Sequence, residues 1–243
     1  MSTTTTTTTG QPAILPEGYE ITNIVAVDEN FNPDPTSEQD VVDKLKAKFK
    51  DFKIEVFLPN IELFEKLAEG QDPKVMLITC IDSRCNPTML FGLEAGEAFV
   101  VRNVANFVHP YEGQHVAHEN AAVGAAIELA VTVMDIKHIV VVGHSNCRGI
   151  KALMTRDDFT TDLVGNWVKV GLPAKEKVKQ LYPELSFDEQ LSLCQKEAVN
   201  VSLKNLLTYP YVKERVKGGG LHIHGMHYNL RHGRLTSWDI VRK

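Results

Sequence analysis

Two short motifs constrain this chain most, because each follows directly on a short apolar run. Residues 75–79 are Val-Met-Leu-Ile-Thr and lead into Cys80, and residues 139–143 are Ile-Val-Val-Val-Gly and lead into His144. Apolar runs of this length are typical of buried strands in a parallel sheet. The carboxyl ends of parallel strands share one edge of the sheet, where ligands bind in such folds. The sequence therefore predicts that both motifs lie together at that edge.

The residue types in the two motifs predict a metal site. Cys80 would bind as a thiolate, and the spacing His144-Ser-Asn-Cys147 lets one turn aim both side chains at one point. Two thiolates and one neutral imidazole neutralise Zn²⁺ and leave its fourth position open, as in catalytic zinc sites. Taken singly, each Cys is better explained as a buried apolar residue and His144 as a loop residue. Their shared position after the strands favours the metal.

Asp82 and Arg84 stand two residues apart in the first motif and would point the same way in an extended segment. A carboxylate beside a metal either orients a bound water or takes the fourth position itself. A bidentate grip by Arg84 on Asp82 would decide between the two. The alternative is a solvated surface ion pair, which contributes little to stability.

The remaining pattern predicts an α/β fold with a mostly parallel central β-sheet, an added edge strand, helices on both faces and an N-terminal helical arm. Ser186-Phe-Asp-Glu189 is a capping-box pattern that opens a long helix. The expected strands are 74–80, 98–102, 138–143, 221–228 and 235–241. The expected helices begin near Ser37, span 61–69, lie within 117–134 and follow Ser186.

Composition limits the class of protein. Residues 1–36 contain a run of threonines (3–9) and are expected to form a disordered or extended tail, with a single domain over 37–243. A net charge of −5 without a Lys/Arg stripe argues against a nucleic-acid partner. No apolar run approaches the roughly 18 residues of a membrane span. The acidic N-terminal segment is unlike an Arg-rich transit peptide, so we expect a cytoplasmic protein.

Several motifs, in this order and spacing, resemble the β-class carbonic anhydrases, and residues 196–210 resemble their plant-type branch. The motifs are Cys80-Ile-Asp-Ser-Arg84, Gly96-Glu-Ala-Phe-Val-Val-Arg-Asn-Val-Ala-Asn106, Gly124-Ala-Ala-Ile-Glu128 and Gly143-His-Ser-Asn-Cys147. The resemblance implies one zinc ion per chain, held by Cys80, His144 and Cys147. It also implies that Asp82 and Arg84 form the catalytic dyad.

The same resemblance implies a substrate pocket and an assembly. Phe99 and Val104 would line a narrow pocket for CO₂, and Gln71 would reach the active site of a neighbouring subunit. The chain would then form a homodimer or a higher even homo-oligomer with active sites at the subunit interface. The implied activity is the reversible hydration of CO₂ to bicarbonate and a proton by zinc-bound hydroxide.

Two alternatives to this activity stay open. The same scaffold could hydrolyse carbonyl sulfide or carbon disulfide, or it could be a weakly active zinc-binding scaffold. Two departures from the plant-type pattern motivate the second alternative. Arg148 stands where that branch usually has Gly, and Leu129 stands where it usually has a pocket Tyr.

His222, His224 and His227 form a second group of candidate ligands near the end of the chain. Alternation along a strand places His222 and His224 on one face, so a second metal is conceivable. Because the family carries no metal there, a structural role is favoured. Cys85 lies close to Cys80, but a redox pair is disfavoured in a reducing cytosol.

Overall fold

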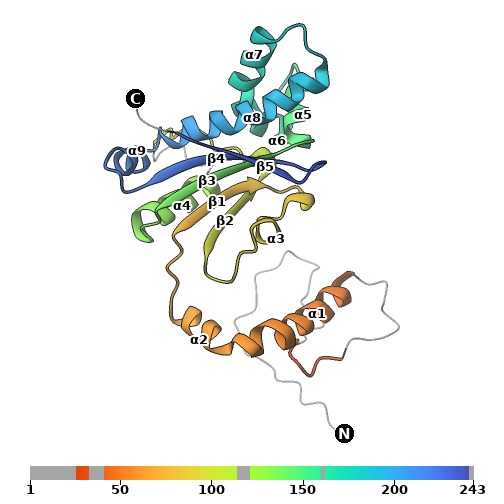
Figure 1. The fold of residues 1–243 in the computed structure, drawn as a ribbon, viewed down its shortest axis with the longest axis vertical. Coiled ribbons are helices and arrows are strands. Elements are labelled where there is room, and N and C mark those ends of the chain that lie inside the picture. The colour runs from red at the N-terminus through yellow and green to blue at the C-terminus, as the bar shows by residue number, and fades with distance from the viewer. Residues whose placement is uncertain (1–25, 33–40, 114–120, 160–161, 241–243) are drawn as a thin grey trace, which may run out of the picture. The chain divides into compact units, whose positions relative to one another are not determined.

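The computed structural model describes residues 26–32, 41–113, 121–159 and 162–240 (Figure 1). Most of the predicted tail over 1–36 lies outside these ranges. The chain divides into two compact units, Met1–Lys66 and Leu67–Lys243. None of the helices within the described ranges is long and apolar enough to cross a membrane.

The first unit is helical, as predicted for an N-terminal arm. Helix α1 spans Val41–Phe52 and runs through a π-helical turn, Lys53–Phe57, and a 3₁₀ turn, Leu58–Asn60, into α2. The expected start near Ser37 lies outside the described residues, whereas α2 spans Ile61–Glu69, the range predicted. Rings within this unit pack on one another, with the centroids of Phe57 and Phe64 stacked 4.8 Å apart.

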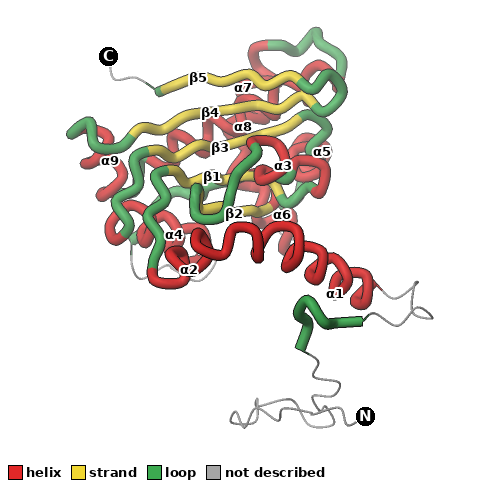
Figure 2. The backbone as a smooth tube through the Cα atoms, turned by 60° about the horizontal axis from the view of Figure 1, so that its bottom comes forward, coloured by secondary structure: helices red, strands yellow, loops and turns green. Residues whose placement is uncertain are grey.

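The second unit is built on a five-stranded sheet in the order β2-β1-β3-β4-β5 (Figure 2). The first four strands in this order are parallel, and β5 adds antiparallel to β4 as the predicted edge strand. The apolar runs that predicted β1 and β3 are buried along almost their whole length, as expected of central parallel strands. The strands are β1 Val75–Cys80, β2 Ala98–Asn103, β3 His138–His144, β4 His222–Asn229 and β5 Arg234–Asp239.

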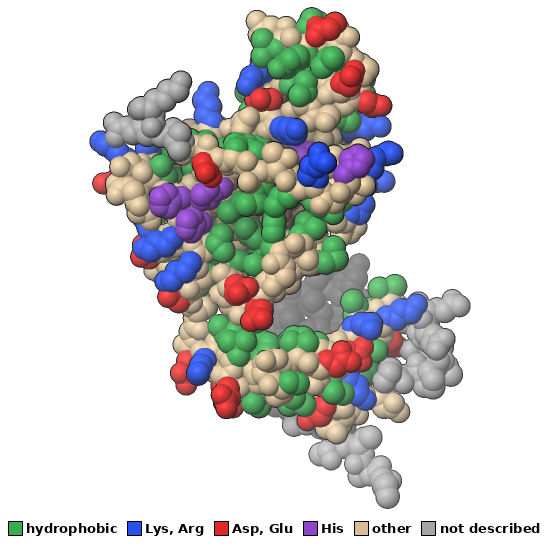
Figure 3. Space-filling view, in the orientation of Figure 1, with side chains coloured by type: hydrophobic (Ala, Val, Ile, Leu, Met, Phe, Trp, Pro, Cys, Tyr) green, Lys and Arg blue, Asp and Glu red, His purple; other side chains and the backbone are tan. Residues whose placement is uncertain are grey.

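The two faces of the sheet differ in how they are covered. On one face Ile78, Val141 and Ile223 pack into a large core together with side chains of α4 (Ala121–Glu128) and α8 (Phe187–Leu206). On the other face Val140 and its neighbours form a small cluster that the short helix α3 (Pro87–Phe91) joins. Hydrophobic side chains of this thinly covered side are visible over the sheet in Figure 3. We refer below to this thinly covered side of the sheet as the open face.

Helices of the second half share a buried cluster with Cys80 and Cys147, at the edge of the sheet where β1 and β3 end. Ser186 and Glu189 form the predicted capping box at the start of α8, with Ser186 Oγ 3.4 Å from the backbone nitrogen of Glu189. The helix expected within 117–134 runs over α4 and a π-helical turn, Leu129–Val133, with 117–120 outside the described residues. The other helices are α5 Arg148–Thr155, α6 Leu163–Val168, α7 Leu172–Leu181 and α9 Pro210–Lys217.

Candidate metal centre

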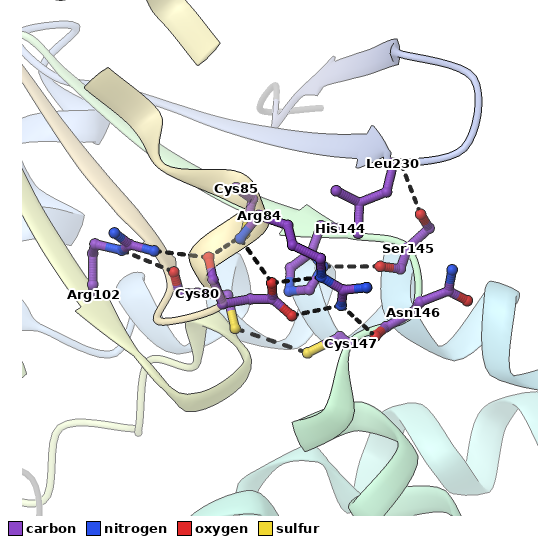
Figure 4. A network of polar contacts seen from close by, with 10 residues as sticks. Cys80, Arg84, Cys85, Arg102, His144, Ser145, Asn146, Cys147 and Leu230 are labelled. Atoms are coloured by element: carbon purple, nitrogen blue, oxygen red, sulfur yellow. Dashed lines mark hydrogen bonds and ion pairs between the residues drawn. The ribbon is translucent and has the colours of Figure 1, made fainter. Parts of the chain in front are cut away.

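Cys80, His144 and Cys147 meet at the carboxyl edge of the sheet (Figure 4). Cys80 ends β1, His144 ends the neighbouring strand β3, and Cys147 is the N-cap residue of α5. Their ligand atoms all lie within 4.8 Å of one another, and the residues are only 4%, 1% and 2% exposed. The sequence prediction that two separate motifs converge on one point is therefore confirmed by the geometry.

The geometry of these three side chains fits a tetrahedral zinc ion. The sulfur atoms of Cys80 and Cys147 lie 3.9 Å apart. Two thiolates at about 2.3 Å from a tetrahedral ion would lie roughly 3.8 Å apart. His144 Nδ1 lies 2.9 Å from the backbone oxygen of Ser145 and donates to it. That bond leaves a lone pair on His144 Nε2, which is buried without a hydrogen-bond partner.

Proton affinities in the triad show what a metal would displace. The hydrogen bond with Cys147 lowers the pKa of the Cys80 thiol to about 4, and the same bond, with burial, raises the pKa of Cys147 far above its usual range. Burial lowers the pKa of His144, but the neighbouring thiols of Cys80 and Cys85 together outweigh burial and raise that pKa to about 10. The three groups therefore share protons that a divalent cation would release on binding.

Asp82 and Arg84 form the predicted pair at the rim of the site. Arg84 Nε donates to Asp82 Oδ1 at 2.9 Å, and its Nη2 donates to Asp82 Oδ2 at 2.7 Å. The guanidinium also lies 3.3 Å from the backbone oxygen of Asn146, which ties the pair to the second motif. Hydrogen bonding by Arg84 holds the pKa of Asp82 well below its usual range. Asp82 is therefore ionised and fixed in orientation at neutral pH.

Arg102 supports this loop from the neighbouring strand β2, a role that the sequence pattern does not reveal. Its Nε donates to the backbone oxygen of Cys80 at 3.0 Å, and its Nη2 donates to that of Asp82 at 2.9 Å. The only signal in the sequence is a cation near the carboxyl end of an apolar strand. Because two backbone carbonyls depend on it, Arg102 fixes the path that brings Asp82 beside Cys80.

Gly149 brings α5 close to the loop after β2. A Cβ atom at this position would lie 2.8 Å from a methyl group of Val104 and 2.9 Å from the Cβ of Ala105. A larger residue would therefore push the start of α5, and with it Cys147, away from the other two ligands. Arg148, by contrast, is exposed.

A cavity of about 560 Å³ opens beside Cys80. Val104, one of the three predicted substrate residues, lines it together with both members of the Asp82–Arg84 pair and with Arg148. Its other lining residues, which the sequence did not single out, are Ile81, Ser83, Gly149 and Val164.

Three other candidates lie outside this cavity. Phe99 is partly buried against the main core, and Gln71 is exposed ahead of β1, at the opposite end of that strand from Cys80. Leu129 is half exposed at the start of a π-helical turn and is not a lining residue either. Within one chain, the structure therefore places only Val104 of the three predicted substrate residues at the site.

Cys85 lies in the same loop but outside the triad. Its thiol donates to the backbone oxygen of Asp82 at 3.2 Å, and the side chain is buried. All four cysteines are free thiols. The geometry gives Cys85 a structural role in shaping the loop.

Comparisons with known proteins agree with this site. A family model described as carbonic anhydrase matches residues 75–235. β-Carbonic anhydrase 3 of Arabidopsis thaliana is 43% identical over 209 residues, which cover 84% of this chain and 80% of that protein. The solved structure of the β-carbonic anhydrase CafA of Aspergillus fumigatus is similar with a TM-score of 0.73 and 30% identity, over 84% of this chain and 93% of that one. A chain from the tetrameric β-carbonic anhydrases of Sordaria macrospora gives a TM-score of 0.67 and 29% identity, over 80% of this chain and 94% of that one. This chain belongs to the β-carbonic anhydrase family, in its plant-type branch.

Proposed function

We propose that this chain catalyses the reversible hydration of CO₂ to bicarbonate and a proton, with one zinc ion per chain held by Cys80, His144 and Cys147. The observation that carries the proposal is the buried Nε2 of His144. It has no hydrogen-bond partner and shares its site with two free thiols. A buried polar atom without a partner is costly, and a metal ion at this position would satisfy it. Membership of the family supplies the reaction.

Zinc, when bound, supplies a Lewis acid that lowers the pKa of a coordinated water toward about 7, and two thiolates moderate that effect by donating charge. Asp82 accepts a hydrogen bond from the O–H of the nucleophile and so directs its lone pair toward the carbon of CO₂. Arg84 keeps Asp82 ionised and holds both of its oxygens. The same grip restrains Asp82 from becoming a ligand itself.

The substrate pocket is proposed to be completed by a second subunit. Val104, Ile81 and Val164 give the cavity apolar walls suited to a small uncharged gas. Gln71 and Phe99 are proposed to bind substrate in the assembled enzyme, with Gln71 entering from the neighbouring subunit. The tetrameric assembly of the Sordaria enzymes supports an even homo-oligomer. Four free cysteines support a reducing compartment such as the cytoplasm.

The test is stopped-flow CO₂ hydration by protein of measured zinc content, across pH. We expect activity proportional to zinc and a rate that rises through neutral pH into the alkaline range. An activity plateau already complete well below pH 7 would contradict the proposed donor set. A zinc content near one ion per chain without CO₂ hydration activity would favour the alternative of a weakly active zinc-binding scaffold. Parallel assays with carbonyl sulfide and carbon disulfide would separate the remaining alternative.

A further inference from the structure

The other end of the sheet carries a second group of metal-ligand side chains. His138 begins β3, and His222, its register partner, begins β4. His224 lies two residues further along β4, opposite Asp239 of β5. All three histidines alternate onto the open face of the sheet, and Figure 3 shows histidine side chains gathered on the drawn face. This group lies at the amino ends of β3 and β4, whereas the cysteine site lies at the carboxyl edge.

Two ring nitrogens in this group already face each other. His138 Nδ1 lies 3.0 Å from His224 Nε2. Two imidazole nitrogens at about 2.0–2.1 Å from one tetrahedral ion would lie roughly 3.3 Å apart, so a small opening of the pair would admit the ion. The rings of His138 and His222 are stacked with centroids 5.3 Å apart. His222 is exposed, so a turn of its side chain can supply a third nitrogen.

Asp239 orients the central ring of the group. Its Oδ1 lies 2.6 Å from His224 Nδ1 and accepts that hydrogen bond. With the proton on Nδ1, the lone pair of Nε2 points toward His138. Protein metal sites commonly pair a ligating histidine with a carboxylate in this way, which fixes the tautomer and increases the basicity of the ligand.

The surroundings of His138 favour its neutral imidazole, the form that binds metals. Burial lowers the pKa of His138, and the neighbouring rings of His224 and His222 lower it further. The alternative to a metal ion is a hydrogen bond between His138 Nδ1 and His224 Nε2. That bond does not involve His222, although the ring of His222 lies close to both of the other rings.

We propose that His138, His222 and His224, with Asp239 behind His224, form a second site for a divalent transition-metal ion with Zn²⁺-like preferences. Imidazole ligands suit Zn²⁺, Ni²⁺ and Cu²⁺ better than Mg²⁺ or Ca²⁺. The site is more exposed than the cysteine site, and one of its ligands must rotate, so it binds more weakly. It does not depend on carbonic anhydrase activity.

The experiment uses the full, untagged chain carrying one equivalent of zinc. Titration with Zn²⁺ in a calorimeter should show a second, weaker equivalent. Co²⁺ added to the same protein should give d–d absorption without a thiolate charge-transfer band, because the cysteines already hold zinc. His224→Ala should abolish the second equivalent and keep the first. Asp239→Asn should weaken the second equivalent by about 10–100-fold.

His232→Ala is the matched control, because His232 is an exposed histidine in the β4–β5 turn, outside the group. It should bind both equivalents. Retention of the first equivalent and an unchanged thermal melt confirm that each variant is folded. His222→Ala alters only an exposed side chain and keeps the test decisive if His224→Ala does not fold. The proposal is overturned if the parent chain binds no second equivalent at millimolar Zn²⁺. It is equally overturned if His222→Ala and Asp239→Asn bind the second equivalent as the parent does.

Discussion

The two ends of β3 carry histidines in opposite circumstances. At the carboxyl end, His144 is buried and oriented by the backbone oxygen of Ser145, beside a loop that Arg102 holds. At the amino end, the paired strands place His138 beside His222, but the exposed ring of His138 is oriented by contacts with other side chains. A backbone contact therefore orients the ring of His144 before any metal binds, whereas side chains orient the ring of His138. Preorganisation of this kind distinguishes a tight resident metal site from a weaker exchangeable one.

The largest effect is expected from a substitution in the cysteine site at the carboxyl end of β3. Cys147→Ser removes one of the three proposed zinc ligands. Proteins bind structural zinc with a free energy of ~10–16 kcal/mol, and losing one ligand of three should remove roughly a third of it. The affinity for zinc should therefore fall about a thousandfold. Zinc content after dialysis and CO₂ hydration should both fall toward background. Cys85→Ser is the matched control, since this buried cysteine of the same loop is outside the triad. Equal zinc loss in both variants would show that loop stability, and not ligation, holds the metal.

The next largest effect tests whether Asp82 contributes to catalysis without contributing to metal binding. Asp82→Asn keeps the shape of the side chain but removes the charge that Arg84 holds. We expect kcat to fall about a hundredfold with zinc content unchanged, because general acid–base and orienting groups contribute about 10²–10⁴-fold. Asp72→Asn is the control, since Asp72 is an exposed carboxylate paired with Lys74 outside the cavity. A kcat for Asp82→Asn that equals that of the control would remove Asp82 from the mechanism.

The contrast between the two ends also marks what the sequence can predict. Cys80 and His144 directly follow apolar strands, and adjacent parallel strands must end at one edge, so their meeting follows from the pattern. The shared face of His222 and His224 also follows, because alternation along one strand determines it. Their contacts with His138 and Asp239 depend on the register between strands, which no local pattern specifies. Arg102 escapes sequence analysis for the same reason, because its partners lie on another strand.

A smaller effect contrasts a buried histidine with an exposed one on the same strand. Burial lowers the pKa of His227 from 6.5 to about 4. Its stabilising contribution is complete above pH 6.5 and is lost as the pH falls toward 4, because the unfolded chain then binds the proton more tightly. A tenfold change in proton affinity corresponds to about 1.4 kcal/mol, so the loss is at most about 3–4 kcal/mol.

Denaturant unfolding at pH 7, 5 and 4 measures this dependence. His227→Gln should lose less stability in acid than the parent chain, by about 2–3 kcal/mol at pH 4. His222→Gln, at an exposed position of β4, is the control for the substitution itself. Zinc content is measured for each protein at each pH, because His227 interacts with the backbone of the candidate ligand His144. If the parent and His227→Gln show parallel curves, the buried ring is not the source of acid sensitivity.

The smallest effect concerns Arg148, the first residue of α5 and a cation on the cavity wall. A positive charge at a helix N-terminus opposes the helix dipole, so its position there costs stability, typically about 0.3–1 kcal/mol. Attraction of bicarbonate to the cavity would offset that cost in function.

We expect Arg148→Gly to raise the KM for bicarbonate about two- to fivefold at low salt and to leave the kcat for CO₂ hydration unchanged. At about 0.15 M ionic strength the difference should shrink, because charges more than about 8 Å apart are then screened. Lys151→Gln removes a cation from the same helix outside the cavity, and an equal rise in KM for that variant would reduce the effect to net charge.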